Sequence, residues 1–166
     1  FLFVPGPSNV PAAVQQAIHC PMEDHRNPTI PDLIQPITED LKKILLTKDG
    51  KVVFFPSSGT GCWEAALQST LNVGDKVLGA SFGQFSMLWL DMCKRLKFEP
   101  ITMEEEWGTG ANPESYHKHL SEDKNHEIKA VLVCQNETAT GVRSDVASIR
   151  KILDDLNHPA LLMVDG

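Results

Sequence analysis

The sequence has little of what defines several protein classes. No apolar run in its 166 residues is long enough to span a bilayer, so we expect no membrane partner. The sequence has 15 basic and 22 acidic residues, and the resulting net charge of -7 argues against nucleic acid as a partner. The four cysteines show neither a C-x-x-C pair nor ligand-like spacing. We therefore expect reduced cysteines, an intracellular protein and no metal site.

Two common nucleotide fingerprints are also missing. Neither G-x-G-x-x-G nor G-x-x-x-x-G-K-[ST] occurs, which speaks against a dinucleotide or a P-loop nucleotide. What is present is ordinary for a globular chain, with 42% hydrophobic and 22% charged residues. The length is sufficient for one domain with a substantial core.

The stretch KVVFFPSSGTGCWEAALQSTL, from Lys51 to Leu71, is the centre of the predicted fold. Its pattern predicts a buried strand over 51–55, a loop over 56–61 and a helix over 62–71. The loop Ser58-Gly59-Thr60-Gly61 offers hydroxyls and free backbone N–H groups at a helix N-terminus, where a phosphate is favoured. The alternative is a plain strand-to-helix turn in which Ser58 or Thr60 caps the helix.

Strands and amphipathic helices alternate through the rest of the chain. Further strands are predicted near 76–80, 98–103, 129–134 and 160–164. The alternation predicts an α/β fold with a mostly parallel sheet and helices on both faces. Ligands of such sheets bind outside the carboxyl ends of the strands. The residues predicted at those ends, or just beyond them, are Ser58-Gly59-Thr60, Gln84-Phe85, Thr138 and Asp165.

Helix starts are also predicted from capping residues. Asp32 is expected to cap a helix near the N-terminus of the chain, with Pro36 close to its start. Asn112, followed by proline and glutamate, predicts a second start. Either Ser144 or Asp145 is expected to cap a third.

Seven stretches, spread from end to end, resemble a known family: LFVPGPSNVP, EDHRNPTIPDL, PSSGTGCWEAAL, GDKVLGASFGQFSMLW, EEEWGTGAN, HEIKAVLVCQNETATGV and HPALLMVDG. Through them the chain resembles the class V, fold-type I aminotransferases that use pyridoxal 5'-phosphate, and most closely the serine–glyoxylate aminotransferases. The fold implied is the N-terminal part of a fold-type I large domain. The D-H-R at 24–26 departs from the D-Y-R of plant members.

The resemblance implies roles for the residues at the sheet edge. Ser58-Gly59-Thr60 matches the turn that binds the cofactor phosphate, and Phe85 matches the aromatic residue that stacks on the pyridine ring. Thr138 matches a hydroxyl residue near the phenolic oxygen of the ring. Asp165 matches the catalytic carboxylate that pairs with the pyridinium nitrogen. From the residues alone, the default interpretation of Phe85 would be a core aromatic and that of Asp165 a turn former, so the family resemblance decides both assignments.

The resemblance also implies substrates and an assembly. His25 and Arg26 match a loop that approaches the neighbouring subunit's active site and is tied to substrate choice, so we expect a homodimer. The implied reaction transfers the amino group of serine to glyoxylate and gives hydroxypyruvate and glycine. Two alternatives stay open within the family, an alanine–glyoxylate aminotransferase and another class V enzyme. From a different class, the alternative is a non-catalytic phosphate- or nucleotide-binding module.

The domain organisation follows from the same resemblance. Residues 1–50 would lead into the large domain, and residues 51–166 would be part of the domain that binds the cofactor. In the family the Schiff-base lysine follows an aspartate like Asp165, and the arginine that binds the substrate lies in a later small domain. Because the sequence begins without methionine and stops just after a strand, we expect a fragment that lacks both. We expect a peroxisomal location, with a role in photorespiration, in a photosynthetic eukaryote, and a cytoplasmic one otherwise.

Overall fold

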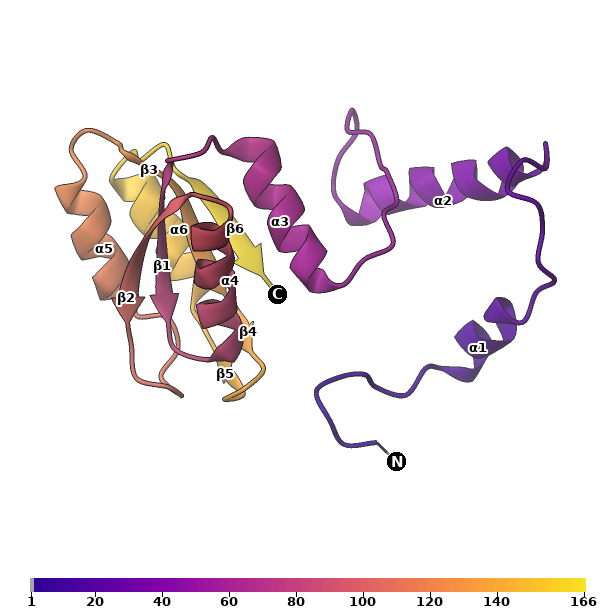
Figure 1. Ribbon diagram of the computed structural model, residues 1–166, viewed down its shortest axis with the longest axis horizontal. Coiled ribbons are helices and arrows are strands. Elements are labelled where there is room, and N and C mark those ends of the chain that lie inside the picture. Colours follow the sequence, from indigo (N-terminus) through magenta and orange to yellow (C-terminus); the bar gives the residue numbers. More distant parts are fainter. Residues whose placement is uncertain (1) are drawn as a thin grey trace. The chain divides into compact units, whose positions relative to one another are not determined.

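The computed structural model describes residues 2–166, which form two compact units, one up to Pro56 and one over Ser57–Gly166. The second unit contains a four-stranded sheet in which every neighbouring pair is parallel, with the strand order β2-β1-β3-β6 (Figure 1). The strands are β1 (Lys76–Ser81), β2 (Glu99–Glu104), β3 (Ile128–Cys134) and β6 (Leu161–Asp165). Four of the five predicted strands are therefore confirmed.

Helices cover both faces of this sheet. They are α3 (Gly59–Thr70), α4 (Gln84–Arg95), α5 (Pro113–Glu122) and α6 (Val146–Asp155). Successive strand residues point to opposite faces, so Val77 packs with α3 and α4, while Leu78 packs with α5 and α6. On β3, Leu132 packs on the side of α3 and α4, and Val131 packs on the side of α5 and α6. The predicted α/β architecture is confirmed, and its core consists of one apolar layer on each side of the sheet.

Tyr116 of α5 marks the point where the strand order changes direction. The register of β1 and β3 ends at the pair Gly79 and Leu132. There the buried Tyr116 hydroxyl accepts a hydrogen bond from the Ala80 N–H at 3.2 Å and donates one to the Leu132 carbonyl at 2.9 Å. Burial raises the pKa of Tyr116, so the hydroxyl stays protonated. Such a switch point, at the carboxyl ends of parallel strands, is where α/β sheets open a crevice for ligands.

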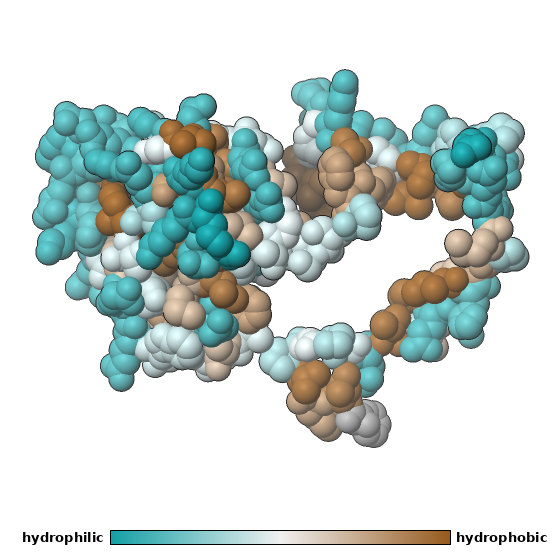
Figure 2. All heavy atoms as spheres, in the orientation of Figure 1, coloured by the Kyte–Doolittle hydropathy of each residue, from teal (hydrophilic) through white to brown (hydrophobic). Residues whose placement is uncertain are grey.

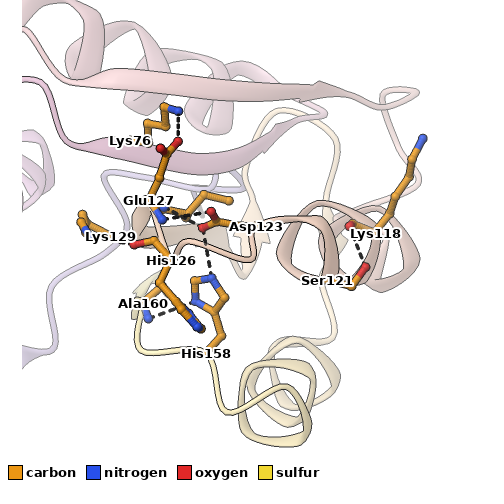
Figure 3. A network of polar contacts seen from close by, with 10 residues as sticks. Lys76, Lys118, Ser121, Asp123, His126, Glu127, Lys129, His158 and Ala160 are labelled. Atoms are coloured by element: carbon orange, nitrogen blue, oxygen red, sulfur yellow. Dashed lines mark hydrogen bonds and ion pairs between the residues drawn. The ribbon is translucent and has the colours of Figure 1, made fainter.

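At the amino-terminal ends of the strands, Asp123 and His158 connect the α5–β3 turn to the start of β6. The Asp123 carboxylate accepts hydrogen bonds from the N–H groups of Glu127 and Ile128 at 2.9 and 2.8 Å. His158 Nε2 lies 3.2 Å from Asp123 Oδ2 (Figure 3). Because the Ala160 N–H donates to His158 Nδ1, a neutral ring carries its hydrogen on Nε2, facing Asp123. This network fastens the amino-terminal edge of the sheet, away from the strand carboxyl ends.

The strand predicted over 51–55 is not formed, and that prediction is wrong for this structure. Residues 51–58 have no regular secondary structure, and Val53, Phe54 and Phe55 are 66%, 49% and 82% exposed. A strand needs a partner whose backbone groups complete the ladder, and none of the described strands pairs with this segment. The β-branched and aromatic composition gave the segment a preference for burial, but composition alone cannot provide a partner.

Two helix starts differ from the prediction. Helix α3 begins at Gly59, so the last residues of the predicted loop form its first turn. The small N-terminal helix α1 (Ala12–Ile18) is followed by α2 (Ile30–Ile44), which begins two residues before the predicted cap. Asp32 therefore lies in the first turn of α2, where its charge favours the positive end of the helix dipole. Pro36, predicted close to the helix start, is instead the seventh of the 15 residues of α2 and lies in its interior, because the helix begins earlier than predicted.

The other capping predictions are confirmed. Asn112 caps α5 by accepting a hydrogen bond from the Glu114 N–H at 3.0 Å. Of the two candidates for α6, Asp145 is the cap, and it accepts from the Ser148 N–H at 3.1 Å. Ser144 instead is buried and bonds to the Ala111 N–H and the Cys134 carbonyl.

The unit up to Pro56 exposes much apolar surface. Figure 2 shows brown apolar patches along its helices, and Leu33, Ile34 and Ile37 of α2 are 61%, 40% and 42% exposed. Among the described residues, no helix is both long enough and apolar enough to cross a membrane. The predicted domain division between residues 50 and 51 stays a prediction.

Candidate functional site

The carboxyl end of the sheet borders a cavity of about 390 Å³, a volume within the range typical of small-molecule sites. Its lining residues are Ser58, Gly59, Thr60, Trp63, Phe85, Asn136, Thr138, Asp165 and Gly166. All six residues that the resemblance assigned to a cofactor are among them. The fold thus brings together residues from α3, α4, the β4–β5 hairpin and β6, where β4 is Asn136–Glu137 and β5 is Val142–Arg143.

The N-terminus of α3 forms one wall of the cavity. Ser58 occupies the N-cap position with an extended backbone, yet its side chain makes no capping hydrogen bond. A Cβ at Gly61 would lie 2.0 Å from Ser57 Oγ, so the Ser57 side chain would have to move, whereas a Cβ at Gly59 would meet nothing within 4 Å. The N–H groups of a first helical turn have no partner within the helix. The turn therefore presents hydroxyls and free N–H groups, an arrangement that suits an anion.

Phe85, near the start of α4, forms an aromatic wall. Its ring is 37% exposed and lies edge-on to Trp63, with centroids 6.4 Å apart and planes at 75°. Trp63 in turn stacks on Trp89, with centroids 5.5 Å apart and planes at 14°. Both tryptophans are buried, so a fixed aromatic layer supports the exposed ring.

Asp165, the last residue of β6, is the charged residue among the described lining residues. It lies beside Cys134 on β3, whose Sγ is 3.9 Å from Asp165 Oδ2. Burial, reinforced by the carboxylates of Glu137 and Asp165, raises the pKa of the Cys134 thiol to about 12. The thiol therefore stays protonated and offers a weak donor to Asp165. Asp165 is half-buried and lines the cavity.

Thr138 lies in the turn that connects β4 and β5. The Glu137 carbonyl accepts hydrogen bonds from the Thr140 and Gly141 N–H groups at 3.2 and 2.8 Å, which closes the turn. Gly141 has a φ of 73°, a left-handed conformation that favours glycine. The turn leaves the Thr138 side chain exposed beside the cavity.

Some residues at this site were not predicted. Trp63 was expected only as an apolar helix position, and Asn136 was not singled out, although both lie beside predicted site residues in the sequence. Gln84 was predicted at the same edge, but the lining formed by the described residues includes only its neighbour Phe85. Glu137 was also missed. It is fully buried, and nothing in the sequence separates it from an exposed glutamate of a turn.

His25 and Arg26 lie in the other compact unit, in the turn that leads to α2. Both residues contact Asp24. The Arg26 N–H donates to Asp24 Oδ1 at 3.0 Å, and His25 Nδ1 lies 3.5 Å from the same oxygen. Their role in substrate choice stays a prediction.

The donor set of the cavity fits pyridoxal phosphate better than a metal ion. A phosphate needs N–H and hydroxyl donors, which the uncapped α3 terminus provides, and a flat ring needs an aromatic wall. A protonated ring nitrogen needs a carboxylate such as Asp165. Within residues 2–166, no group of three histidine, cysteine or acidic side chains could hold a metal ion.

Comparison with known proteins agrees with this fold. The family model for class V aminotransferases matches residues 1–166. A serine–glyoxylate aminotransferase from Hyphomicrobium methylovorum is 60% identical over 99% of this chain and 41% of its own length. An L-aspartate–glyoxylate aminotransferase from Paracoccus denitrificans is 47% identical over 99% of the chain and 42% of its own length. The chain thus spans about two fifths of the length of these curated relatives.

Solved structures show the same fold. A pyridoxamine–pyruvate aminotransferase from Mesorhizobium loti superposes with a TM-score of 0.85 at 21% identity, over 98% of this chain and 40% of that structure. The sheet, with the uncapped α3 turn, the aromatic wall and the strand-end carboxylate at its carboxyl end, has the fold of these fold-type I aminotransferases. With the family match over its whole length, the chain belongs to the class V aminotransferase family.

Proposed function

We propose that this chain forms the cofactor-binding part of an aminotransferase that uses pyridoxal phosphate and passes an amino group from a small amino acid to glyoxylate. The observation that carries the proposal is the shared cavity, where the uncapped α3 terminus, Phe85 and Asp165 face the same space. The family match and the relatives named above support it. The competing view, a non-catalytic phosphate module, gives Asp165 no task, since a carboxylate repels a phosphate.

Each lining residue has a task in this proposal. Ser58-Gly59-Thr60 binds the phosphate through hydroxyls and backbone N–H groups. Phe85 stacks on the pyridine ring and excludes water from one face, and the Thr138 hydroxyl bonds near the phenolic oxygen. Asp165 accepts a hydrogen bond from the ring nitrogen and holds a proton on it. When bound, pyridoxal phosphate supplies the electron sink that amino-group transfer requires.

For the donor, we propose serine, with hydroxypyruvate and glycine as products. The support is the 60% identity to a serine–glyoxylate aminotransferase. Aspartate is the second candidate, because an L-aspartate–glyoxylate aminotransferase is 47% identical over nearly the same span. Alanine stays open as well. The names of both relatives give glyoxylate as the acceptor, so glyoxylate has more support than any one of the donors.

The test is an assay of the full-length protein with pyridoxal phosphate, glyoxylate and, in turn, serine, alanine and aspartate. Glycine should form with at least one donor, and the serine reaction should also give hydroxypyruvate. The ratio kcat/KM ranks the donors. If no glycine formed with any donor, while the protein bound the cofactor, the aminotransferase proposal would be wrong.

We further propose that the full-length protein is a homodimer in which His25 and Arg26 of one subunit serve the site of the other. The support is the family resemblance of the 23–33 segment and the large exposed apolar surface of the unit up to Pro56. Light scattering after size-exclusion chromatography measures the mass directly. A monomer at micromolar concentration would contradict this part of the proposal.

A further inference from the structure

Glu137 is a fully buried carboxylate whose donors are backbone N–H groups of two different segments. Its Oε2 accepts from Phe85 and Ser86 at 3.1 and 3.0 Å, and its Oε1 accepts from Phe85 and Ala139, both at 3.2 Å. Phe85 and Ser86 lie at the start of α4, whereas Ala139 lies in the turn after β4. One carboxylate therefore holds both segments.

The start of α4 depends on this distant residue. Its N-cap is Gly83, which has no side chain and cannot cap the helix, so Glu137 supplies the acceptor from 52 and 51 positions along the chain. A negative charge at a helix N-terminus also interacts favourably with the helix dipole. The Glu137 charge thus stabilises the first turn of α4, which carries Phe85.

Gly83 and Glu137 are matched in size. A Cβ at Gly83 would lie 2.2 Å from Glu137 Cγ and 2.3 Å from Glu137 Cδ. Contacts this short do not occur in folded proteins, so any side chain at position 83 would displace the carboxylate. The backbone of Gly83 is extended, with φ at 178°, so glycine is needed for space and not for its backbone conformation.

The two anchored segments carry two proposed cofactor contacts. Phe85 itself donates to Glu137, and Thr138 lies between Glu137 and Ala139 in the sequence. Both Phe85 and Thr138 line the cavity, whereas Glu137 does not. We propose that Glu137 is a positioning residue, which fixes the aromatic wall and the Thr138 turn relative to each other before the cofactor binds. This inference rests on the proposed function of the cavity.

Glu137→Gln is the sharpest substitution, because it keeps the shape but removes one acceptor. In the variant, one of the two carboxylate oxygens becomes an NH₂ group that faces N–H donors. Either the Ser86 or the Ala139 hydrogen bond is then lost, together with the charge at α4. Hydrogen bonds to a charged group are stronger than neutral ones, so we expect pyridoxal phosphate to bind roughly tenfold more weakly.

The experiment compares full-length variants by pyridoxal phosphate titration and by visible circular dichroism of the bound cofactor. Glu114→Gln is the matched control, since Glu114 is an exposed acid in the first turn of α5, and its affinity and dichroism should match the unsubstituted protein. Glu137→Asp keeps the charge and both oxygens, so its affinity for pyridoxal phosphate should lie between that of Glu137→Gln and that of the unsubstituted protein. This variant replaces Glu137→Gln in the experiment if the glutamine variant does not fold. Equal affinity and dichroism in folded Glu137→Gln would overturn the proposal.

A double-mutant cycle separates positioning from general stability. If Glu137 acts through Phe85, then Glu137→Gln should weaken binding much less in a Phe85→Ala background than in the native one. Fully additive losses would overturn the inference. Amide hydrogen exchange without cofactor should be faster at Phe85 and Ala139 in Glu137→Gln, and unchanged exchange would also overturn it. If the unsubstituted protein bound no pyridoxal phosphate, the proposed function would fail instead, while the exchange data would still report on the anchor.

Discussion

Trp63 meets the ring of Phe85 edge-on, with the two centroids 6.4 Å apart and the planes at 75°. In this geometry the positive edge of one ring faces the negative face of the other, which favours one orientation of Phe85. Trp63 also stacks on Trp89, with centroids 5.5 Å apart and planes at 14°. Phe85 therefore offers the cavity a ring whose orientation is favoured by its packing on Trp63.

The first prediction concerns this ring. Phe85→Ala in the full-length protein should weaken pyridoxal phosphate binding about fivefold, since an aromatic stack is worth about 1 kcal/mol beyond its buried area. Phe85→Tyr keeps the flat face and is the matched control. The dissociation constant measured by cofactor titration decides the matter. Unchanged affinity in Phe85→Ala would contradict the proposed stacking role.

A second prediction concerns the strand-end carboxylate. Asp165→Asn keeps the shape of the side chain but removes the charge proposed to hold a proton on the ring nitrogen. Turnover should fall by about 10- to 1,000-fold, because a neighbouring opposite charge shifts a pKa by about 1–3 units. Asp155→Asn, an exposed aspartate paired with Lys151, is the control. Near-normal kcat in Asp165→Asn would show that the pyridinium assignment is wrong.

Donor choice is the subject of a third prediction. His25→Tyr introduces the D-Y-R that the family resemblance implies for plant members, so it should change KM for serine relative to alanine and aspartate while leaving cofactor affinity unchanged. His19→Tyr, another exposed histidine of the same unit, should change neither. Steady-state kinetics with the three donors provide the measurement. An unaltered order and ratio of KM values would remove the 25–26 loop from the substrate site.

A fourth prediction concerns pH and stability. Burial alone would raise the pKa of the Asp123 carboxyl, but the hydrogen bonds from Ile128, Glu127 and His158 together lower it below its ordinary value of 3.8. A lowered pKa in the folded state stabilises the protein above the unfolded value. That contribution is lost as the pH falls through the lower, folded value.

The measurement is the urea midpoint of unfolding between pH 6 and pH 2.5. The unsubstituted protein should lose stability toward the acid end, and Asp123→Asn should show a smaller loss over the same range. Asp75→Asn, which removes a carboxyl that accepts from the Asn72 N–H, is a control for a generic acid effect. Identical acid profiles for Asp123→Asn and the unsubstituted protein would contradict the assignment.

The cysteines allow a prediction that does not depend on function. Burial raises the pKa of both Cys93 and Cys134 to about 12, so little thiolate forms near pH 8. Cys20 is exposed. Iodoacetamide at pH 8 should therefore alkylate Cys20 rapidly and Cys93 and Cys134 only after unfolding in urea, as read by peptide mass spectrometry. Equal rates at Cys20 and Cys134 in the folded protein would show that the β3 thiol is accessible.

Local patterns in the sequence were sufficient for the fold class and for most of the site. The period of apolar residues is a property of each segment, so it predicted β1, β2, β3, β6 and the helices between them. Parallel strands place their carboxyl ends on one edge, and this general rule placed Phe85, Thr138 and Asp165 together. Ser58-Gly59-Thr60 was placed there through the strand predicted over 51–55, which is not formed, so its position at the N-terminus of α3 is what brings it to the cavity. The capping roles of Asn112 and Asp145 also follow from short-range chemistry.

Tertiary structure decided the rest, because each remaining feature depends on groups far apart in the chain. Residues 51–55 have the composition of a strand, but whether a strand forms depends on a partner that no local pattern contains. Trp63 was visible only as an apolar helix position, and its contact with Phe85 comes from the packing of α3 beside α4. Glu137 shows this most clearly. A glutamate after a strand is ordinarily solvated, and it is buried here only because the uncapped start of α4, with Gly83 lacking a side chain, needs an acceptor from another element.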